Sequence, residues 1–330
     1  MDLRQLRYFV AVARERNFTR AAAALHIAQP PLSRQIQLLE EELGVELISR
    51  RSRPLRLTEA GRLFHEQALQ ILGRVEQMKI ATRRAGKGQR SVLSIGFVAS
   101  TLYGGLPLLV RKLRQHSPEL DIQLLEMMSL QQIEALKTGR IDIGFGRIRS
   151  SDPAVERTVL REECLLVAIP PDTPLAATDA PIPLDQLAGT TLIVYPKEPR
   201  PSFADQVLNL LNEHDVRVGQ IQEVRELQTA LGLVAAESGI CIIPYAARLL
   251  RAGLHYRLID HERATSPIIL SHRVNDHSQH IVLIKRLLGE LYAEPAPWLD
   301  NSANGSPEPS PHPQHDLDTA LKPHQRTRKA

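Results

Sequence analysis

The first 90 residues place apolar positions at the spacing of amphipathic helices. One helical stripe consists of Leu6, Phe9, Val10 and Ala13. A second, short helix is predicted over residues 20–25, with Thr19 as its N-cap. A third helix is predicted over residues 32–43 and ends at Gly44, because glycine readily adopts the left-handed conformation that closes helices. Two short helices joined by a tight turn predict a helix-turn-helix.

The residues around that turn support the prediction. Ala22 offers a small side chain where the two helices must approach closely, and Leu32 can anchor the second helix in the core. His26 falls where the turn needs a left-handed residue, and histidine is enriched there among residues other than glycine. Pro30 and Pro31 fit the first helical turn, where a missing N–H leaves no helical bond unmade.

A longer helix is predicted from Thr58, as its N-cap, to about residue 85. Its apolar positions recur at alternating steps of four and three, at Phe64, Ala68, Ile71, Val75 and Met78. This heptad pattern favours a seam against a partner helix; the other interpretation is a stripe that packs on the chain's own core. The glycine-containing residues 85–90 predict a hinge.

Beyond the hinge, short apolar runs alternate with helical segments, which predicts an α/β domain with largely parallel sheets. The runs cover residues 92–98, 122–127, 141–145, 164–169, 191–195, 221–224, 240–244 and 268–272. Helices are predicted over residues 106–116, 130–138, 203–213, 227–237 and 279–292. From residue 293 the chain is rich in Pro, Ser, Asn and His, which predicts a disordered tail. His312 and His315 in that tail are interpreted as solvated side chains rather than metal ligands.

Charge is distributed unevenly over these segments. Residues 1–90 hold 17 Arg or Lys against 9 Asp or Glu, a net charge of +8, whereas the remaining 240 residues carry a net charge of −4. A basic first quarter indicates a module that binds a polyanion. No apolar run is long enough for a signal peptide or a membrane span, so we expect a cytoplasmic protein with no membrane partner. Cys164 and Cys241 are accordingly expected to be buried free thiols.

The polyanion indicated by the helix-turn-helix is double-stranded DNA. Gln29, Ser33, Arg34 and Gln37 lie at the exposed start of the second helix of the motif. Gln and Arg can read adenine and guanine edges in the major groove, and Ser suits a phosphate oxygen. A cationic run follows at Arg50, Arg51 and Arg53, placed like a wing over the DNA backbone.

Several segments of the sequence resemble the LysR-type transcriptional regulators. The resemblance is carried by Leu3-Arg-Gln-Leu-Arg-Tyr-Phe-Val-Ala-Val, Phe18-Thr-Arg-Ala-Ala, Ala28-Gln-Pro-Pro-Leu-Ser-Arg-Gln-Ile and Leu57-Thr-Glu-Ala-Gly, and it extends through nearly all of residues 1–292. It implies a multidomain α/β protein with an N-terminal winged helix-turn-helix, a long dimerising linker helix and a two-subdomain effector domain shaped like a periplasmic binding protein. It also implies a dimer of dimers on operator DNA, with RNA polymerase as a further partner.

The resemblance places the domain boundaries. The DNA-binding domain is expected at residues 1–57, the linker helix and hinge at 58–89, the effector-binding domain at 90–292 and the tail at 293–330. Within the effector domain, one subdomain combines about 90–161 with 268–292, and the other covers 162–267. Many family members have Ser at the position of Ala28, so this helix is expected to lack one N-cap hydrogen bond, worth about 1 kcal/mol.

The effector domain offers polar groups at several helix starts near strand ends, where ligands bind in α/β sheets. Ser100 and Thr101 follow the first strand, Ser129 heads a segment of capping-box form, and Ser202 precedes a helix with Asp205 in its first turn. Arg147 lies just beyond the strand at residues 141–145 and can supply the positive charge for a carboxylate. A small organic acid is therefore the predicted ligand, although Ser129 and Ser202 taken singly are equally well explained as helix caps.

The sequence further resembles the subgroup of regulators that control aromatic catabolism and respond to muconate or chloromuconate. The matching segments are Pro30-Pro31, Ile143-Gly-Phe-Gly-Arg147, Pro201-Ser-Phe203 and Glu223-Val-Arg-Glu-Leu-Gln-Thr-Ala-Leu-Gly-Leu-Val-Ala-Ala. This similarity implies an activator of catechol or benzoate ortho-cleavage genes that responds to cis,cis-muconate, with a chloromuconate-responsive regulator of chlorocatechol genes as the alternative. The implied effector site consists of Ser100, Thr101, Ser129, Arg147, Pro201 and Phe203, with Ser202 beside them. Glu226 is expected to pair with Arg147 in the empty site. Some relatives have a second pocket for an aromatic acid, and its candidate residues in this chain are Arg161 and Tyr292.

Other function classes fit the sequence less well. His65-Glu66 lacks a second histidine at metal-binding spacing, and no nucleophile elbow, phosphate-binding loop or complete dinucleotide fingerprint occurs, so we expect neither an enzyme nor a cofactor. A solute-binding protein would need export and would lack the first 57 residues. A structural chromatin-like protein would bind DNA without the pocket residues.

Overall fold

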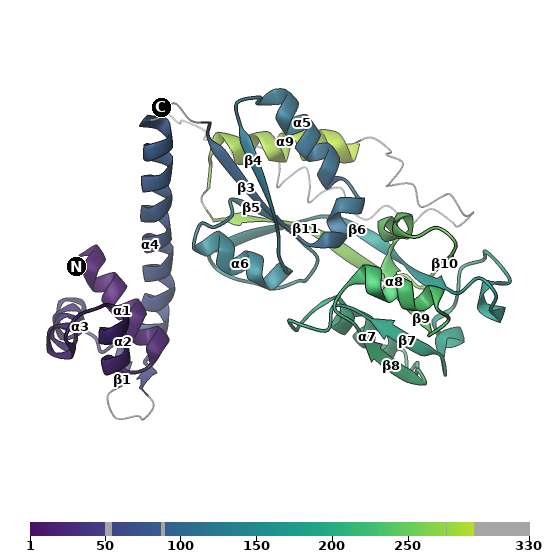
Figure 1. Cartoon of the computed structure of the whole chain (residues 1–330), viewed down its shortest axis with the longest axis horizontal. Helices are drawn as coiled ribbons and strands as arrows, with labels where there is room; N and C mark the ends of the chain where they lie inside the picture. Colours follow the sequence, from purple (N-terminus) through teal and green to yellow (C-terminus); the bar gives the residue numbers. More distant parts are fainter. Residues whose placement is uncertain (50–54, 87–89, 275, 294–330) are drawn as a thin grey trace, which may run out of the picture. The chain divides into compact units, whose positions relative to one another are not determined.

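The computed structural model describes residues 1–49, 55–86, 90–274 and 276–293 (Figure 1). Two compact units are present, the first built on residues 1–91 and the second on residues 92–136 and the described residues from 141 on. The predicted wing arginines Arg50, Arg51 and Arg53 lie outside the described residues, as does the predicted tail with His312 and His315.

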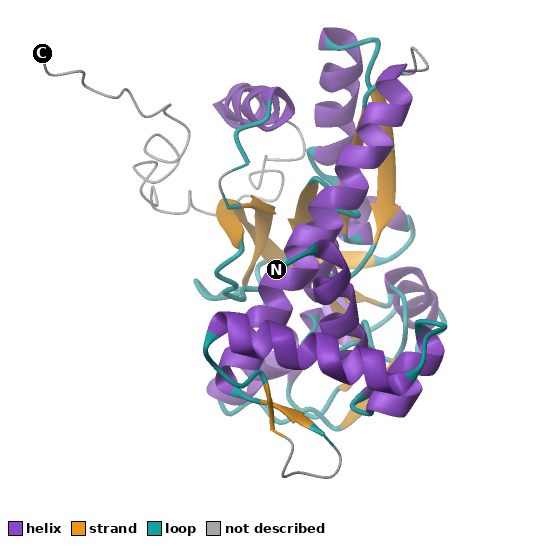
Figure 2. Ribbon diagram, turned by 90° about the vertical axis from the view of Figure 1, so that its left-hand side faces the viewer, coloured by secondary structure: helices purple, strands orange, loops and turns teal. Residues whose placement is uncertain are grey.

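The first unit is a helical domain with one small hairpin. Its helices are α1 (Leu3–Glu15), α2 (Phe18–Ala24), α3 (Gln29–Leu43) and α4 (Glu59–Gly86), and its strands are β1 (Ile48–Ser49) and β2 (Arg56–Leu57). The two strands pair antiparallel, and Figure 2 shows them side by side next to the helices. The N-cap predicted at Thr19 is wrong: α2 begins two residues earlier, and the side chain of Asn17 accepts the N–H of Arg20 at 3.0 Å.

Four other local predictions for this unit are confirmed. His26, in the turn between α2 and α3, has a left-handed backbone with φ of 55°, and Gly44 ends α3 with φ of 69°. Ala28 occupies the N-cap of α3 without a side-chain hydrogen bond. Thr58 caps α4, because its hydroxyl accepts the N–H of Gly61 at 2.9 Å. The turn and the helix ends therefore follow from local residue chemistry.

The core of the first unit fixes α2 and α3 against α1. Its fully buried members are Phe9, Val12, Ala21, Leu32, Ile36, Leu39 and Ile48. Phe64 of α4 packs edge-on against Phe9, with ring centroids 5.1 Å apart. The heptad stripe of α4 thus divides: its first position serves the chain's own core, whereas Ile71 and Met78 are 41% and 61% exposed. The exposed positions are those a partner helix would cover.

The second unit contains a nine-stranded mixed sheet with helices packed against it. Its strands are β3 (Val92–Phe97), β4 (Asp121–Glu126), β5 (Ile143–Gly146), β6 (Val155–Ile169), β7 (Thr191–Val194), β8 (Gln220–Glu223), β9 (Ile240–Pro244), β10 (His255–Leu258) and β11 (Thr265–Arg273). Its α-helices are α5 (Leu106–His116), α6 (Ser129–Lys137), α7 (Phe203–Glu213), α8 (Leu227–Ala235) and α9 (Gln279–Ala293). Short 3₁₀ helices are η1 (Ala99–Tyr103), η2 (Pro174–Ala176), η3 (Leu184–Leu187) and η4 (Tyr245–Leu250).

The sheet is less parallel than the alternation predicted. The strand order is β4-β3-β5-β11-β6-β9-β7-β8, with β10 beside β6. The pairs of β3 with β4 and β5, and of β7 with β8 and β9, are parallel, but β6 and β11 run antiparallel to their neighbours. The difference arises because β6 extends from Val155 to Ile169 and, with β11, joins two parallel half-sheets.

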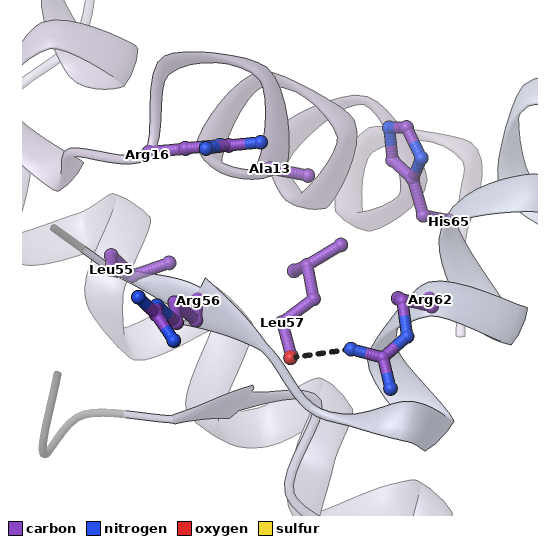
Figure 3. A pocket seen from close by; sticks show the side chains of 7 residues that line it. All are labelled: Ala13, Arg16, Leu55, Arg56, Leu57, Arg62 and His65. Carbon is purple, nitrogen blue, oxygen red and sulfur yellow. Dashed lines mark hydrogen bonds between the residues drawn. The ribbon is translucent and has the colours of Figure 1, made fainter.

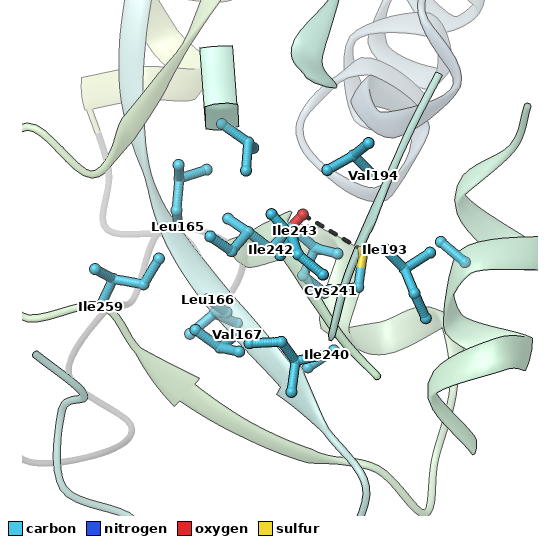
Figure 4. Close-up of a cluster of buried hydrophobic side chains, with 14 of the residues drawn as sticks. Leu165, Leu166, Val167, Ile193, Val194, Ile240, Cys241, Ile242, Ile243 and Ile259 are labelled. Atoms are coloured by element: carbon cyan, nitrogen blue, oxygen red, sulfur yellow. Dashed lines mark hydrogen bonds between the residues drawn. The ribbon is translucent and has the colours of Figure 1, made fainter. Parts of the chain in front are cut away.

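Each half-sheet has its own apolar core. In one core, α5 and α9 contribute Leu109, Leu113, Ile284 and Leu287 against Ile95 of β3 and Leu270 of β11. In the other, α7 and α8 cover β7 and β9, and Figure 4 shows Val167, Ile193, Cys241 and Ile243 packed together. Neither cysteine forms a disulfide: Cys241 is buried as predicted, whereas Cys164 is only half-buried. Across the described segments, no helix is both long and apolar enough to span a membrane.

Candidate DNA-binding surface and effector pocket

The start of α3 presents the side chains that the sequence assigned to base reading. Gln29, Pro30, Pro31, Arg34 and Gln37 are exposed, and Ser33 is half-buried. Leu32 and Ile36 between them are fully buried, which fixes the rotation of the helix. A helix whose first turns present Gln and Arg is suited to hydrogen bonding with base edges in the major groove.

The second unit contains a cavity of about 410 Å³ between the end of β5 and the first turns of α7. Arg147, Ile148 and Arg149 line it from the segment after β5, and Pro201 and Ser202 line it from the start of α7. Further lining residues are Leu165, Asp205, Gln206, Asn209, Leu210, Glu213, Arg263, Thr265 and Pro267. The cavity therefore joins elements of both half-sheets, in the size range of small-ligand pockets.

Arg147 is the centre of a buried polar network at this cavity. Its side chain is 4% exposed; Nε donates to the Ser100 hydroxyl at 2.7 Å, and Nη2 donates to Glu163 Oε2 at 2.5 Å. The Ser129 hydroxyl accepts the backbone N–H of Arg147 at 3.0 Å and that of Ile148 at 3.3 Å. Ser129 is the first residue of α6, and its hydroxyl holds the segment after β5 in place. The sequence left a helix cap and a pocket residue equally open for Ser129, and both of these hydrogen bonds lead to the segment that carries Arg147.

One predicted contact of this network is contradicted. Glu226 does not pair with Arg147: it is exposed at the N-cap of α8, and Glu163 of β6 occupies the position expected for it. This partner could not be predicted from local sequence, because Glu163 reaches Arg147 through the pairing of β6 with β11 and of β11 with β5.

The remaining predicted pocket residues lie near the network but differ in access to the cavity. Pro201 and Ser202 line it, whereas Thr101 is buried and donates its hydroxyl to the carbonyl of Val98, the residue before η1. Phe203 packs its ring against Tyr195, with centroids 5.4 Å apart. Ser202 is the N-cap residue of α7, and its hydroxyl donates to the Pro196 carbonyl at 3.0 Å.

Two buried polar atoms beside this network have no hydrogen-bond partner among the described residues. They are Nη1 of Arg147 and the hydroxyl of Tyr195. Burial raises the pKa of Tyr195 well above its usual value, and Arg147 only partly opposes this, so the hydroxyl remains a protonated donor. Because a buried donor without a partner is costly, both atoms mark a place for an acceptor. Tyr195 was not predicted as a site residue, because in the sequence it only ends an apolar run.

An ion-pair network fixes the first turn of α7 at the cavity wall. Asp205 accepts the N–H of Ser202 at 2.6 Å and pairs with Arg200 Nη1 at 2.5 Å, while Arg200 also pairs with Glu223. Burial would raise the pKa of Asp205, but the bonds from Ser202 and Arg200 outweigh it and lower that pKa. The carboxylate therefore stays ionised and orders the helix start.

The second pocket suggested at Arg161 and Tyr292 involves two half-buried side chains. Burial raises the pKa of Tyr292 to about 12, with Arg161 opposing the rise, and burial lowers the pKa of Arg161. No group of three or more potential metal ligands occurs among the residues described in either unit.

Comparison with known proteins covers nearly the whole described chain. A sequence profile for the bacterial regulatory helix-turn-helix protein of the lysR family matches residues 3–62, and one for the LysR substrate binding domain matches residues 86–291. The probable cat1 operon transcriptional activator of Acinetobacter lwoffii is 69% identical over 300 residues, which cover 91% of this chain and 99% of that protein.

Two relatives of known structure are similar in both units. BenM of Acinetobacter baylyi is 43% identical over 305 residues, covering 90% of this chain and 100% of that protein. The structure of the BenM effector binding domain with its effector benzoate matches 64% of this chain and 99% of that chain, with 38% identity and a TM-score of 0.59. The structure of full-length CbnR with its target DNA matches 88% of this chain and 100% of that chain, with 30% identity and a TM-score of 0.57.

Proposed function

The chain belongs to the LysR family of bacterial transcriptional regulators, and on that premise we propose that it activates catechol or benzoate ortho-cleavage genes in response to cis,cis-muconate or a closely related small organic acid. The observation that carries the choice of ligand is Nη1 of Arg147, a buried cationic donor without a partner at a cavity of small-molecule size. The relatives support it: one is named for a cat operon and another has benzoate, a carboxylate, as its effector.

The cavity suits a ligand with two carboxylates. One carboxylate accepts from Nη1 of Arg147 and the Tyr195 hydroxyl. The second faces the start of α7, where the helix dipole favours negative charge. Since Arg147 follows β5 of one half-sheet and α7 covers the other, such a ligand bridges the two halves and favours their closed arrangement. Closure of the two half-sheets around the ligand is the conformational change through which an inducer acts on the DNA-binding unit.

We assign the other roles as follows. Residues 1–57 read the operator through α3, and residues 58–89 join two chains along the exposed apolar positions of α4, with a dimer of dimers on DNA and contact with RNA polymerase. Residues 90–292 bind the effector. A solute-binding protein without a transcriptional role is disfavoured because the helix-turn-helix profile covers residues 3–62.

The test measures ligand-induced thermal shifts of the full-length protein. Millimolar cis,cis-muconate is expected to raise the Tm of the wild type and to leave Arg147→Met unshifted. Arg149→Met is the matched control, because Arg149 lines the same cavity but is 62% exposed and pairs with Glu162. A larger shift with chloromuconate would favour the chlorocatechol alternative. Absence of any shift with muconate, chloromuconates and benzoate would contradict a carboxylate effector.

A further inference from the structure

The DNA-binding unit contains a cavity that no role above uses. Its volume is about 490 Å³, and it lies between the end of α1, strand β2 and the first turns of α4. Its lining consists of Ala13, Arg16, Leu55, Arg56, Leu57, Arg62 and His65, so it includes three arginines and no carboxylate. Figure 3 shows Leu57 in the middle of the group, with Arg16, Arg56 and Arg62 around it.

The positive charge of this cavity has no counter-charge in the described parts of the chain. Arg16, Arg56 and Arg62 are exposed, and none of them forms an ion pair with a described residue. Arg62 only approaches the Leu57 carbonyl, at 3.5 Å. Neighbouring arginines behave differently: on α1, Arg14 pairs with Glu15 at 3.1 Å. Three unneutralised guanidinium groups over an apolar floor are suited to an oxyanion.

The cavity lies between the end of α1, which leads directly into α2, and strand β2 of the hairpin. Arg16 ends α1 in a left-handed conformation, with φ of 48°, and is directly followed by Asn17, the N-cap of α2. The first helix of the motif crosses the backbone, and helix starts contact phosphates. Arg56 begins the second strand of the hairpin β1–β2. An anion bound by both sides would connect the start of α2 with the hairpin.

We propose that Arg16, Arg56 and Arg62 bind one phosphate group of the DNA backbone, outside the groove that α3 reads. The apolar side chains of Leu57 and Ala13 line the same cavity, and attraction between opposite charges is stronger beside apolar groups than in bulk water. The contact is independent of base sequence and fixes the register of α3 on the duplex. It rests on DNA binding by the helix-turn-helix, and it adds a site to that binding.

The test measures the affinity of the full-length protein for a duplex of random sequence over a series of salt concentrations. The slope of log Kobs against log salt is negative for DNA binding. The double variant Arg16→Gln/Arg62→Gln is expected to make this slope less steep by about 0.9, the value for one lost phosphate contact. Arg14→Gln, which removes an arginine of the same helix that already has a partner, is expected to leave the slope unchanged. The single variant Arg56→Gln tests the same site from the hairpin side and is also expected to make the salt slope less steep.

The outcomes separate this site from DNA binding as such. A wild type that fails to bind the duplex contradicts the helix-turn-helix function. A wild type that binds, with all pocket variants retaining both slope and Tm, contradicts only the phosphate site. Inorganic phosphate without DNA tests whether the cavity instead binds a free anion. The proposal is overturned if phosphate raises the Tm of the wild type but not of the double variant, while the double variant keeps the salt slope of the wild type for DNA binding. In that case the cavity binds free phosphate and not the DNA backbone.

Discussion

Arg147 and Glu163 form a buried ion pair, with Nη2 and Oε2 2.5 Å apart and each side chain 4% exposed. The other carboxylate oxygen of Glu163 accepts the N–H of Ala246, at the start of η4, at 2.6 Å. Glu163 therefore neutralises the guanidinium while leaving its Nη1 edge without a partner. A ligand carboxylate that binds this edge must approach a group whose charge is already compensated, so Glu163 is expected to weaken ligand binding even as it positions Arg147.

Glu163→Gln is expected to tighten binding of cis,cis-muconate by on the order of tenfold. The substitution removes a like charge next to the incoming carboxylate, while the amide oxygen still accepts from Arg147 or Ala246. Because Arg147 then remains buried without its counter-charge, the free energy of unfolding falls by about 3 kcal/mol. Calorimetric titration and urea denaturation measure the two effects.

The matched control for this experiment is Glu162→Gln on the same strand, since Glu162 is half-exposed and pairs with Arg149. Glu162→Gln should change neither the free energy of muconate binding nor the free energy of unfolding by more than about 0.5 kcal/mol. Weaker muconate binding by Glu163→Gln than by wild type would show that positioning of Arg147 outweighs charge competition.

Tyr195→Phe is expected to affect binding and stability in opposite directions. The hydroxyl is buried without a partner in the described structure, so its removal leaves the unfolding free energy of the unliganded protein unchanged or raises it by up to about 1 kcal/mol. If the hydroxyl donates to the effector, the variant loses about tenfold in muconate affinity. Equal affinity of variant and wild type in calorimetric titration would remove Tyr195 from the site.

Local chemistry made much of the fold predictable. Helices α5 and α7 agree with their predicted bounds to the residue, and the left-handed turn residue His26 was identified from its type and place. The first nine residues of β6 were missed because polar side chains such as Glu156, Arg157 and Glu162 interrupt the apolar pattern. Their environment is set by the neighbouring β11, which no local pattern reveals.

The candidate pocket was predictable only in part, for the same reason. Arg147 was identified because a cation directly after a buried strand faces the ligand edge of an α/β sheet. Glu163 lies 16 residues away in sequence and meets Arg147 only through strand pairing. The pairing expected for Glu226 came from resemblance alone, and the N-cap position of that residue leaves it exposed. Contacts between distant strands are therefore what sequence periodicity cannot supply.

Arg34→Ala is expected to weaken binding to the operator by about 1–3 kcal/mol, because an exposed arginine in the first turns of α3 can make two hydrogen bonds to a guanine. Binding to a random duplex should change far less, since base contacts contribute little to it. Fluorescence anisotropy with an operator selected from a random duplex library measures both. Arg14→Ala is the control, and an operator affinity of Arg34→Ala equal to that of wild type would exclude Arg34 from base reading.

Ala28→Ser is expected to stabilise the DNA-binding unit by about 1 kcal/mol. Ala28 has the extended backbone of an N-cap, with φ of −74° and ψ of 151°, so a serine hydroxyl there can accept an N–H from the first turn of α3. Asn17→Ala is the converse variant, because it deletes the cap of α2 and should destabilise by a similar amount. Urea denaturation measures both. A loss of stability in Ala28→Ser would mean that the helix start cannot accommodate the hydroxyl.

Asp276→Asn is expected to change the acid stability of the effector domain. Asp276 is 7% exposed; its carboxylate accepts from Arg273 Nη2 at 2.8 Å and from the N–H of Ser278 at 3.2 Å. Burial acts to raise the pKa of Asp276, but Arg273 and the hydrogen bonds outweigh it and hold that pKa below the usual 3.8. The folded state therefore binds fewer protons than the unfolded state as the pH falls through this range.

The sign of that linkage determines the expected curve. The stabilisation by Asp276 is complete above its usual pKa of 3.8 and is lost as the pH falls through the lower folded value. At pH 7, Asp276→Asn should therefore lower the unfolding free energy by about 1.5–3 kcal/mol, and the difference from wild type should shrink as denaturation is repeated at lower pH. Asp179→Asn, at a side chain that is 83% exposed, is the control and should follow the wild type. A difference that stays constant down to the acid transition would show that Asp276 acts through packing, because packing does not depend on the charge of the carboxylate.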